Sequence, residues 1–200
     1  MTLTPCILTF PSERAVFLRE ENAKLYTVGP YFLGKFLVDM VPTIIFPVIC
    51  SAISYWMVGL NSENAGKVFF FFLVCIVMSC TALGVGYLAG SSFSDAKIAT
   101  AVMPLFIMPF MLFAGFYKNS ADFASWIGWF QYLSPFKYSF MAVSINEFTT
   151  SSHAPYNPNP IETLNFSLDR WESIGCLLGL FAFYTIAAFI VLATLKRRVQ

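Results

Sequence analysis

Long uncharged stretches dominate the pattern of hydrophobic and polar positions in this 200-residue chain. Four of them lack Asp, Glu, Lys and Arg over 20 to 27 residues: Met40–Ser62, Val68–Ser94, Ile98–Tyr117 and Ser173–Leu195. A helix needs about 20 mostly apolar residues to cross the hydrocarbon core, where only helices and closed barrels can span. Because the runs are continuous and do not alternate with a period of two, they exclude a barrel. The pattern predicts an all-α, polytopic membrane protein.

The same pattern divides the chain into predicted segments. With their flanks, the uncharged stretches predict membrane spans over residues 31–60, 68–92, 98–117 and 172–195. Short turns join the first three spans, whereas the long loop 118–170 precedes the last span. Residues 1–10 are apolar but too short to span, and residues 196–200 form a polar tail.

Basic residues indicate the orientation of the spans. Arg14, Arg19 and Lys24 precede the first span, and a Lys-Arg-Arg run at 196–198 follows the last. Cytoplasmic flanks are enriched in Lys and Arg, so both ends are predicted to be cytoplasmic, in the plasma membrane or an internal membrane. The segment 11–30 mixes charged and apolar residues, which predicts an amphipathic helix on the cytoplasmic surface. It acts either as a simple topogenic flank or as a lever that contacts a cytoplasmic partner.

Composition agrees with this class. The chain is 58% hydrophobic and 12% charged, with 23 Phe residues, and its net charge of +1 argues against nucleic acid as the main partner. All five cysteines lie in the N-terminal apolar fragment or in predicted helices. Their positions predict small buried apolar residues, with no disulfide framework and no metal site.

The outer loop contains a segment that is not loop-like. Within 123–148, apolar residues recur at spacings of three and four, which predicts one apolar helical face; these are Trp126, Trp129, Phe130, Leu133 and Phe136. Pro135 then divides the segment into two short helices. Such a helical hairpin suits the membrane interface or a re-entrant hairpin packed against other spans, but an ordinary helical cap over the bundle is an equal alternative. Residues after Phe148 predict an irregular loop, with a glycosylation sequon at Asn165.

Two apparent catalytic signals are coincidences. Gly29–Lys35 matches the start of a phosphate-binding loop, but Phe36 stands where Ser or Thr must bind magnesium. His153, the only histidine, lies in the polar loop without a nearby acid or nucleophile. No other Gly-rich loop, triad or metal cluster is present in the sequence, so we expect no catalytic site and no enzyme activity in this chain.

Charged and small residues within the spans are more informative. Lys35 and Asp39 lie one helical turn apart at the inner end of the first span. They form either a snorkelling pair or part of a polar network that couples the two halves of the membrane domain. Small residues near Gly84 in the second span predict close helix contact.

Several motifs together resemble one known family. They are "ERAVFLREENAKLY", "YFLGKFLVDMVP", "ISYWMVGL", "MLFAGF" and "WIGWFQYLSPFKYSFMAVSINEF". In this order they are similar to the transmembrane domain of the G subfamily of ABC transporters, the White and breast-cancer-resistance type of half-transporter. The resemblance implies the fold of a type-2 ABC exporter transmembrane domain, of which this chain matches only the C-terminal part. Residues 1–10 then correspond to the tail of a truncated span.

The resemblance also implies partners that this chain does not contain. Members of the family carry a nucleotide-binding domain, which binds ATP and Mg, and they work as homo- or heterodimers in membrane lipid. Glu13, Arg14 and Glu20 would lie in the inner loop that contacts that domain in cis or in trans. No cofactor is expected in this chain itself.

Cavity residues follow from the same resemblance. Met108 and Met111 would face a central substrate cavity, and Phe116 and Tyr117 would form the constriction that closes it outward. The implied function is the permease portion of an ATP-driven exporter of lipid-like or amphipathic small molecules. The alternative is a truncated, non-transporting membrane protein that dimerises with full-length relatives and modulates them.

Overall fold

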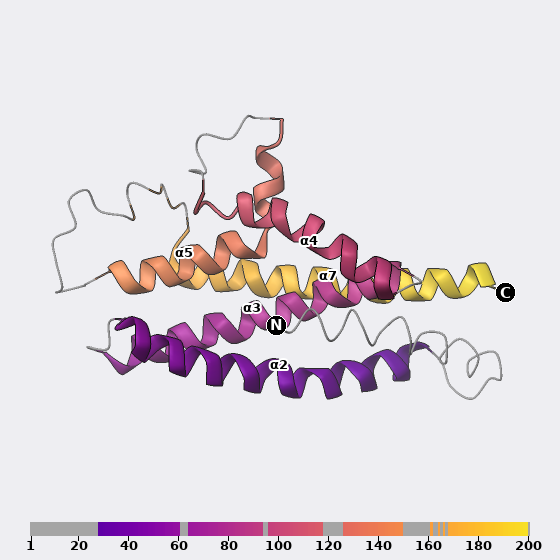
Figure 1. Ribbon diagram of the computed structural model, residues 1–200, viewed down its shortest axis with the longest axis horizontal. Helices are drawn as coiled ribbons and strands as arrows, with labels where there is room; N and C mark the ends of the chain where they lie inside the picture. Colours follow the sequence, from indigo (N-terminus) through magenta and orange to yellow (C-terminus); the bar gives the residue numbers. More distant parts are fainter. Residues whose placement is uncertain are drawn as a thin grey trace. The chain divides into compact units, whose positions relative to one another are not determined.

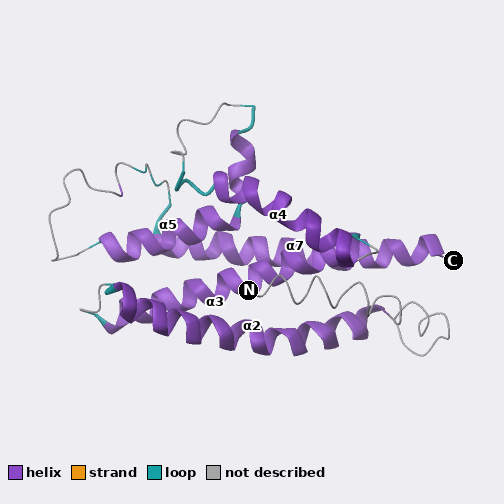
Figure 2. Cartoon of the chain, viewed as in Figure 1, coloured by secondary structure: helices purple, strands orange, loops and turns teal. Residues whose placement is uncertain are grey.

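The computed structural model describes residues 28–60, 64–93, 96–117, 126–149, 161, 164, 166 and 168–199. In this part of the chain the backbone forms helices joined by turns, and no strand occurs among these residues (Figure 2). The prediction of an all-α protein is confirmed. Long apolar runs with few charges satisfy their backbone hydrogen bonds within each helix, which is why they adopt this structure.

Three helices are long and apolar enough to cross a membrane (Figure 1). They are α2 (Val28–Val58), α3 (Ala65–Ser92) and α7 (Arg170–Val199). Each overlaps one of the uncharged stretches. Gly59, with φ of 71°, follows α2 directly, and glycine adopts this left-handed conformation without steric cost.

A shorter helix, α4 (Ala96–Leu112), lies over the predicted span 98–117 and has 17 residues. It ends five residues before the predicted span does, because the backbone turns at residues 113–117. Gly115, with φ of 89°, provides the conformation that this turn needs. At 1.5 Å per residue, α4 is about 25 Å long, somewhat less than a hydrocarbon core of about 30 Å.

Two short helices follow in the region of the predicted hairpin. The 3-10 helix η2 (Gly128–Leu133) and helix α5 (Pro135–Phe148) are separated by Ser134. Pro135 occupies the first position of α5, where its missing N–H costs nothing and its fixed φ favours the helix. The start of the predicted hairpin, 123–125, lies outside the described residues.

The chain divides into two compact units. Among the described residues, the first unit comprises residues 28–45 of α2, 79–92 of α3, 96–105 of α4 and 181–199 of α7. The second unit comprises residues 46–58 of α2, 65–78 of α3, 106–112 of α4 and 170–180 of α7, together with η2 and α5.

Aromatic and aliphatic side chains form the core of the first unit. A buried cluster unites α2, α3 and α7 and consists of Phe32, Leu83, Tyr87, Ala188 and Leu192. The Phe32 ring centroid lies 5.6 Å from that of Tyr87 and 5.5 Å from that of Phe189. Gly84 lets α3 approach α7 closely, because a Cβ atom there would lie 3.1 Å from Thr185 Oγ1 and 3.5 Å from a backbone oxygen.

The core of the second unit shows how α5 runs. Ala142 of α5 packs with Phe70 and Val74 of α3, and Tyr138 packs with Val77 of the same helix. Residue numbers therefore fall along α3 as they rise along α5, so α5 lies antiparallel to α3. The helix α5 therefore packs along α3 over about two helical turns.

Candidate functional site

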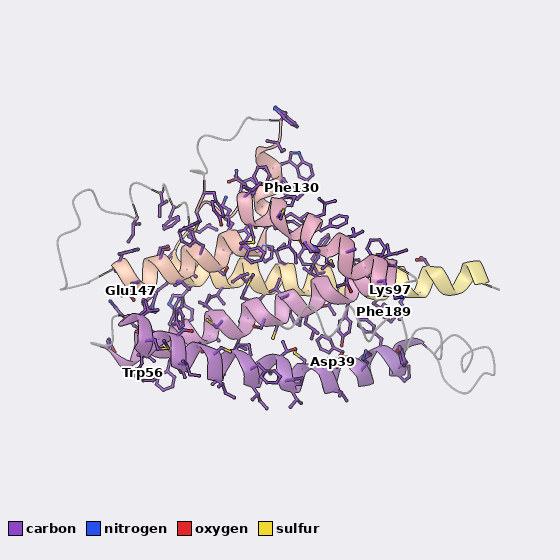
Figure 3. All side chains as sticks on the ribbon, in the orientation of Figure 1. Asp39, Trp56, Lys97, Phe130, Glu147 and Phe189 are labelled. Carbon is purple, nitrogen blue, oxygen red and sulfur yellow. The ribbon has the colours of Figure 1, made fainter. Side chains whose placement is uncertain are left out.

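A polar network lies in the first unit, on α2 and α3. Lys35 Nζ lies 3.5 Å from Asp39 Oδ2, one helical turn away, with side chains 12% and 27% exposed. The Tyr87 hydroxyl, on α3, donates a hydrogen bond of 2.7 Å to the same carboxylate oxygen. Figure 3 labels Asp39 on α2. A single carboxylate thus receives an ammonium group from its own helix and a hydroxyl group from the neighbouring helix.

The Tyr87 hydroxyl is more deeply buried than Lys35 and therefore depends more on its hydrogen bond to Asp39. Tyr87 is 1% exposed and belongs to the apolar cluster of the first unit. A hydroxyl group buried to this extent needs a hydrogen-bond partner. A hydrogen bond to a charged acceptor is roughly twice as strong as one to a neutral acceptor. Asp39 therefore contributes to the fixed packing of α2 against α3 in addition to its pairing with Lys35.

The four side chains assigned to the cavity and constriction lie in the second unit. Met108 and Met111 are on α4, and Phe116 and Tyr117 lie in the turn after it. All four are exposed. The rings of Phe116 and Tyr117 contact each other, with centroids 5.1 Å apart, and Phe116 also contacts Phe140 of α5 at 5.7 Å. The structure thus places an aromatic residue of α5 beside the two residues that were predicted to form a constriction.

A second polar cluster joins η2 to α5. Lys137 Nζ donates a hydrogen bond of 2.9 Å to Gln131 Oε1 and lies 4.5 Å from the centre of the Tyr132 ring. The Ser134 hydroxyl donates to the carbonyl oxygen of Phe110 on α4. Lys137, Gln131 and Ser134 are all buried. Burial lowers the pKa of the Lys137 ammonium group below its ordinary value, because a charged group is disfavoured away from water.

The far end of α5 is tied to the beginning of α3. Lys67 Nζ donates a hydrogen bond of 2.7 Å to the carbonyl oxygen of Thr149, and Asn146 Nδ2 donates one of 3.0 Å to the carbonyl oxygen of Lys67. A cation at the C-terminal end of a helix also interacts favourably with the helix dipole. Two hydrogen bonds in opposite directions thus fix the end of α5.

Other predicted residues lie outside the described part of the chain. These are Glu13, Arg14 and Glu20 of the inner segment, together with His153 and Asn165 of the long loop. Among the described residues, no group of three His, Cys, Asp or Glu side chains is placed to hold a metal ion.

Sequence reasoning missed Tyr87, Gln131 and Lys137 as members of the two polar clusters. The sequence does not single out Tyr87, because a tyrosine within an apolar helix often serves only to fill the core. Gln131, Ser134 and Lys137 follow one another at intervals of three within an otherwise aromatic segment. That interval places polar groups along one side of the hairpin and was the signal available for this cluster.

Comparisons with known proteins show which family the chain resembles. A family model described as "ABC-2 type transporter" matches residues 1–148. "ABC transporter G family member 1" of Dictyostelium discoideum is 30% identical over 96% of this chain and 26% of that protein. "Protein white" of Drosophila melanogaster is 35% identical over 80% of this chain and 25% of that protein. "Broad substrate specificity ATP-binding cassette transporter ABCG2" of Rattus norvegicus is 30% identical over 77% of this chain and 23% of that protein. The chain therefore spans about a quarter of the length of these curated relatives.

Proposed function

This chain belongs to the ABC-2 type transporter family, as part of a G-subfamily membrane domain, and on that premise we propose that it forms the permease portion of an ATP-driven exporter. The carrying observation is the family match over residues 1–148, together with relatives whose names describe transporters. Three membrane-length apolar helices agree with an integral membrane protein. The proposed energy source is ATP hydrolysis on a nucleotide-binding domain outside these 200 residues.

In this proposal the polar network of the first unit transmits movement between helices. The carboxylate of Asp39 links α2 to α3 through Tyr87, so the two helices shift together when either is pushed. The inner segment with Glu13, Arg14 and Glu20 would receive that push from the nucleotide-binding domain. A contiguous chain of hydrogen bonds with a buried member is suited to this task.

The proposed cargo is a lipid-like or amphipathic small molecule. Met108, Met111, Phe116 and Tyr117 present thioether and aromatic surface that one copy of the chain leaves uncovered. Methionine adapts to ligands of different shape, and aromatic rings stack on flat apolar groups. A second half-transporter, identical or related, would complete the cavity in a dimer.

The test is ATP-dependent uptake of a fluorescent amphipathic dye into inside-out membrane vesicles. The vesicles come from cells that express the gene product containing this chain. We expect Asp39→Ala to lower the uptake rate about tenfold, because typical coupling free energies of 1–3 kcal/mol correspond to 5- to 150-fold effects. Asp39→Asn is the matched control, since its amide oxygen still accepts the Tyr87 hydrogen bond.

Three outcomes separate this function from its alternatives. Uptake that needs ATP and falls in Asp39→Ala supports the exporter. No uptake by the chain, combined with co-purification with a full-length relative and reduced export by that relative, would support the modulator instead. ATP hydrolysis by this chain purified alone would contradict the proposed division of labour, because the nucleotide-binding domain supplies that activity.

A further inference from the structure

Helix α4 ends before the apolar run in which it lies. The uncharged stretch continues to Tyr117, but α4 ends at Leu112, and its length of about 25 Å is less than a hydrocarbon core of about 30 Å. Continuation of the helix to Tyr117 would add about 7.5 Å. A helix over residues 96–117 would then be about 33 Å long and would cross the core completely. The apolar pattern thus favours a longer helix than the structure contains.

Backbone hydrogen bonds show where the helix is interrupted. In a continuing α-helix the Ala114 amide would donate to the carbonyl oxygen of Phe110, four residues earlier. It donates instead to that of Met111, three residues earlier, at 3.2 Å. Gly115 follows with φ of 89°, a conformation that residues with a Cβ atom rarely adopt. The carbonyl oxygen of Phe110 is therefore left for another donor.

Ser134 provides this donor from the hairpin that η2 and α5 form. Its hydroxyl donates a hydrogen bond of 2.7 Å to the carbonyl oxygen of Phe110, and Ser134 is 0% exposed. A carbonyl group at a helix end needs a partner when it is buried away from water. If the helix continued, the Ala114 amide would satisfy the same carbonyl oxygen. Two donors are thus available to one acceptor in two different lengths of α4.

Aromatic contacts hold the hairpin on this end of α4. The ring of Phe130, labelled in Figure 3, stacks on Phe110 at 5.1 Å and contacts Phe113 at 5.3 Å. After the turn, the ring of Phe116 contacts Phe140 of α5 at 5.7 Å. These contacts favour the short α4, because they depend on the turn that brings Phe116 to α5.

Continuation of the helix would give Phe116 a different position. Residues four apart share one face of a helix, so Phe116 would follow Met108 and Leu112 on the same face. Both of these side chains are more than half exposed. Phe116 therefore lies against α5 when α4 is short and extends an exposed apolar face when α4 is long.

From these observations we propose that the end of α4 is a two-state element. In the short form, which this structure contains, α4 ends at Leu112 and Ser134 holds the carbonyl group of Phe110. In the long form the helix continues to Tyr117, and Phe116 moves from α5 to the exposed face of α4. The movement changes which side chains border the constriction of the exporter. That gating role rests on the proposed function, whereas the two forms of α4 do not.

The test is hydrogen exchange at the amides of Phe116 and Tyr117, measured by mass spectrometry. The gene product that contains this chain is reconstituted in phosphatidylcholine nanodiscs. In the short form neither amide donates a backbone hydrogen bond within the described part of the chain. In the long form they would donate to the carbonyl oxygens of Leu112 and Phe113. Exchange therefore becomes slower as the long form becomes more populated.

Gly115→Ala should slow the exchange most. Alanine at a positive φ disfavours the short form about tenfold, and its higher helix propensity favours the long form about fivefold. Ser134→Ala should shift the equilibrium about fivefold in the same direction, because the Phe110 carbonyl loses this donor in the short form. The matched controls are Gly175→Ala in α7 and Ser139→Ala, whose hydroxyl bonds within α5. Neither control should change the exchange.

The direction of the change distinguishes two forms of α4 from a fixed turn. Slower exchange in Gly115→Ala and Ser134→Ala, with unchanged controls, supports the proposal. In a fixed turn both substitutions would only loosen the end of α4, so exchange would be faster or unchanged, and either result would overturn the proposal. If Gly115→Ala does not fold, as judged by gel filtration, Ser134→Ala decides alone.

Dye uptake into vesicles tests the gating role separately. A protein held in the long form does not complete a cycle between two forms, so Gly115→Ala should lower ATP-dependent uptake by about fivefold or more. Slower exchange with undiminished uptake would support the two forms and overturn the gating role. Absence of uptake by the unmodified protein would contradict the proposed function, and the exchange result would still decide whether α4 has two forms.

Discussion

The two units each contain a lysine side chain, and the two lysines differ in their burial and in their partners. In the first unit, Lys35 pairs with Asp39 at the edge of an apolar aromatic cluster, and both side chains keep some exposure. In the second unit, Lys137 is 5% exposed, and its ammonium group lies beside a neutral amide and an aromatic ring. In the first arrangement the charged groups of Lys35 and Asp39 can still reach solvent or lipid headgroups. In the second, the Lys137 ammonium group is buried between η2 and α5. Loss of a partner should therefore cost little in the first unit and much more in the second.

The two units also differ in the interactions that stabilise them. The first unit depends on close apolar approach of its helices, with Gly84 where α3 comes close to α7. The second unit places hydrogen-bonded polar groups among its helices, at Gln131, Ser134 and Asn146. Substitutions that add volume should harm the first unit most, and substitutions that remove a hydrogen-bond acceptor should harm the second.

Gly84→Leu should have the largest effect. A Cβ atom at this position already lies 3.3 Å from Tyr184 Cβ and 3.5 Å from the carbonyl oxygen of Phe181, so a full leucine must separate the helices. We expect a loss of about 3 kcal/mol in the free energy of unfolding, measured by titration with a denaturing detergent. Gly175→Leu on α7 is the control, because no heavy atom lies within 4 Å of its Cβ position. Equal losses in the two variants would contradict close packing at Gly84.

Gln131→Leu should have the next largest effect. It removes the acceptor of the Lys137 hydrogen bond and leaves a buried ammonium group that, among the described residues, has the Tyr132 ring as its remaining partner. We expect a loss of about 2 kcal/mol, the usual range for a hydrogen bond to a charged group. Adding Lys137→Met should restore most of this stability, because both polar partners are then absent. A double-mutant cycle measures the difference, and simple additivity of the two changes would contradict the pairing.

Tyr87→Phe should have a smaller effect in the first unit. The substitution removes the hydroxyl that donates to Asp39, but the carboxylate keeps Lys35 and is partly exposed, so it recovers solvation. We expect a loss of about 1 kcal/mol in the same detergent titration. Tyr117→Phe, at an exposed tyrosine, should change stability by less than about 0.5 kcal/mol. A loss in Tyr87→Phe no larger than in Tyr117→Phe would show that the hydrogen bond contributes nothing.

Local patterns predicted the helices and the Lys35–Asp39 pair, since both depend on residues close in the sequence. Uncharged stretches determine membrane-length helices through backbone hydrogen bonding, and an interval of four determines the pair. The contact of Asp39 with Tyr87 joins residues 48 positions apart, and nothing in either local sequence specifies it. The early end of α4 was also missed, because an apolar run continues past Leu112 and only the conformation of Gly115 shows the turn.

Lys35→Met should have the smallest effect of the series. Methionine keeps most of the apolar length of the lysine side chain, while Asp39 retains its hydrogen bond from Tyr87 and its partial exposure. Helical pairs at this spacing contribute about 0.3 kcal/mol, so we expect stability to fall by no more than about 0.5 kcal/mol. The matched comparison is Lys137→Met, measured in the same titration with and without Gln131→Leu. Lys35→Met could instead lower the free energy of unfolding by as much as Gln131→Leu does. Asp39 would then depend on Lys35 as strongly as the buried Lys137 depends on Gln131, and the contrast between the two units would fail.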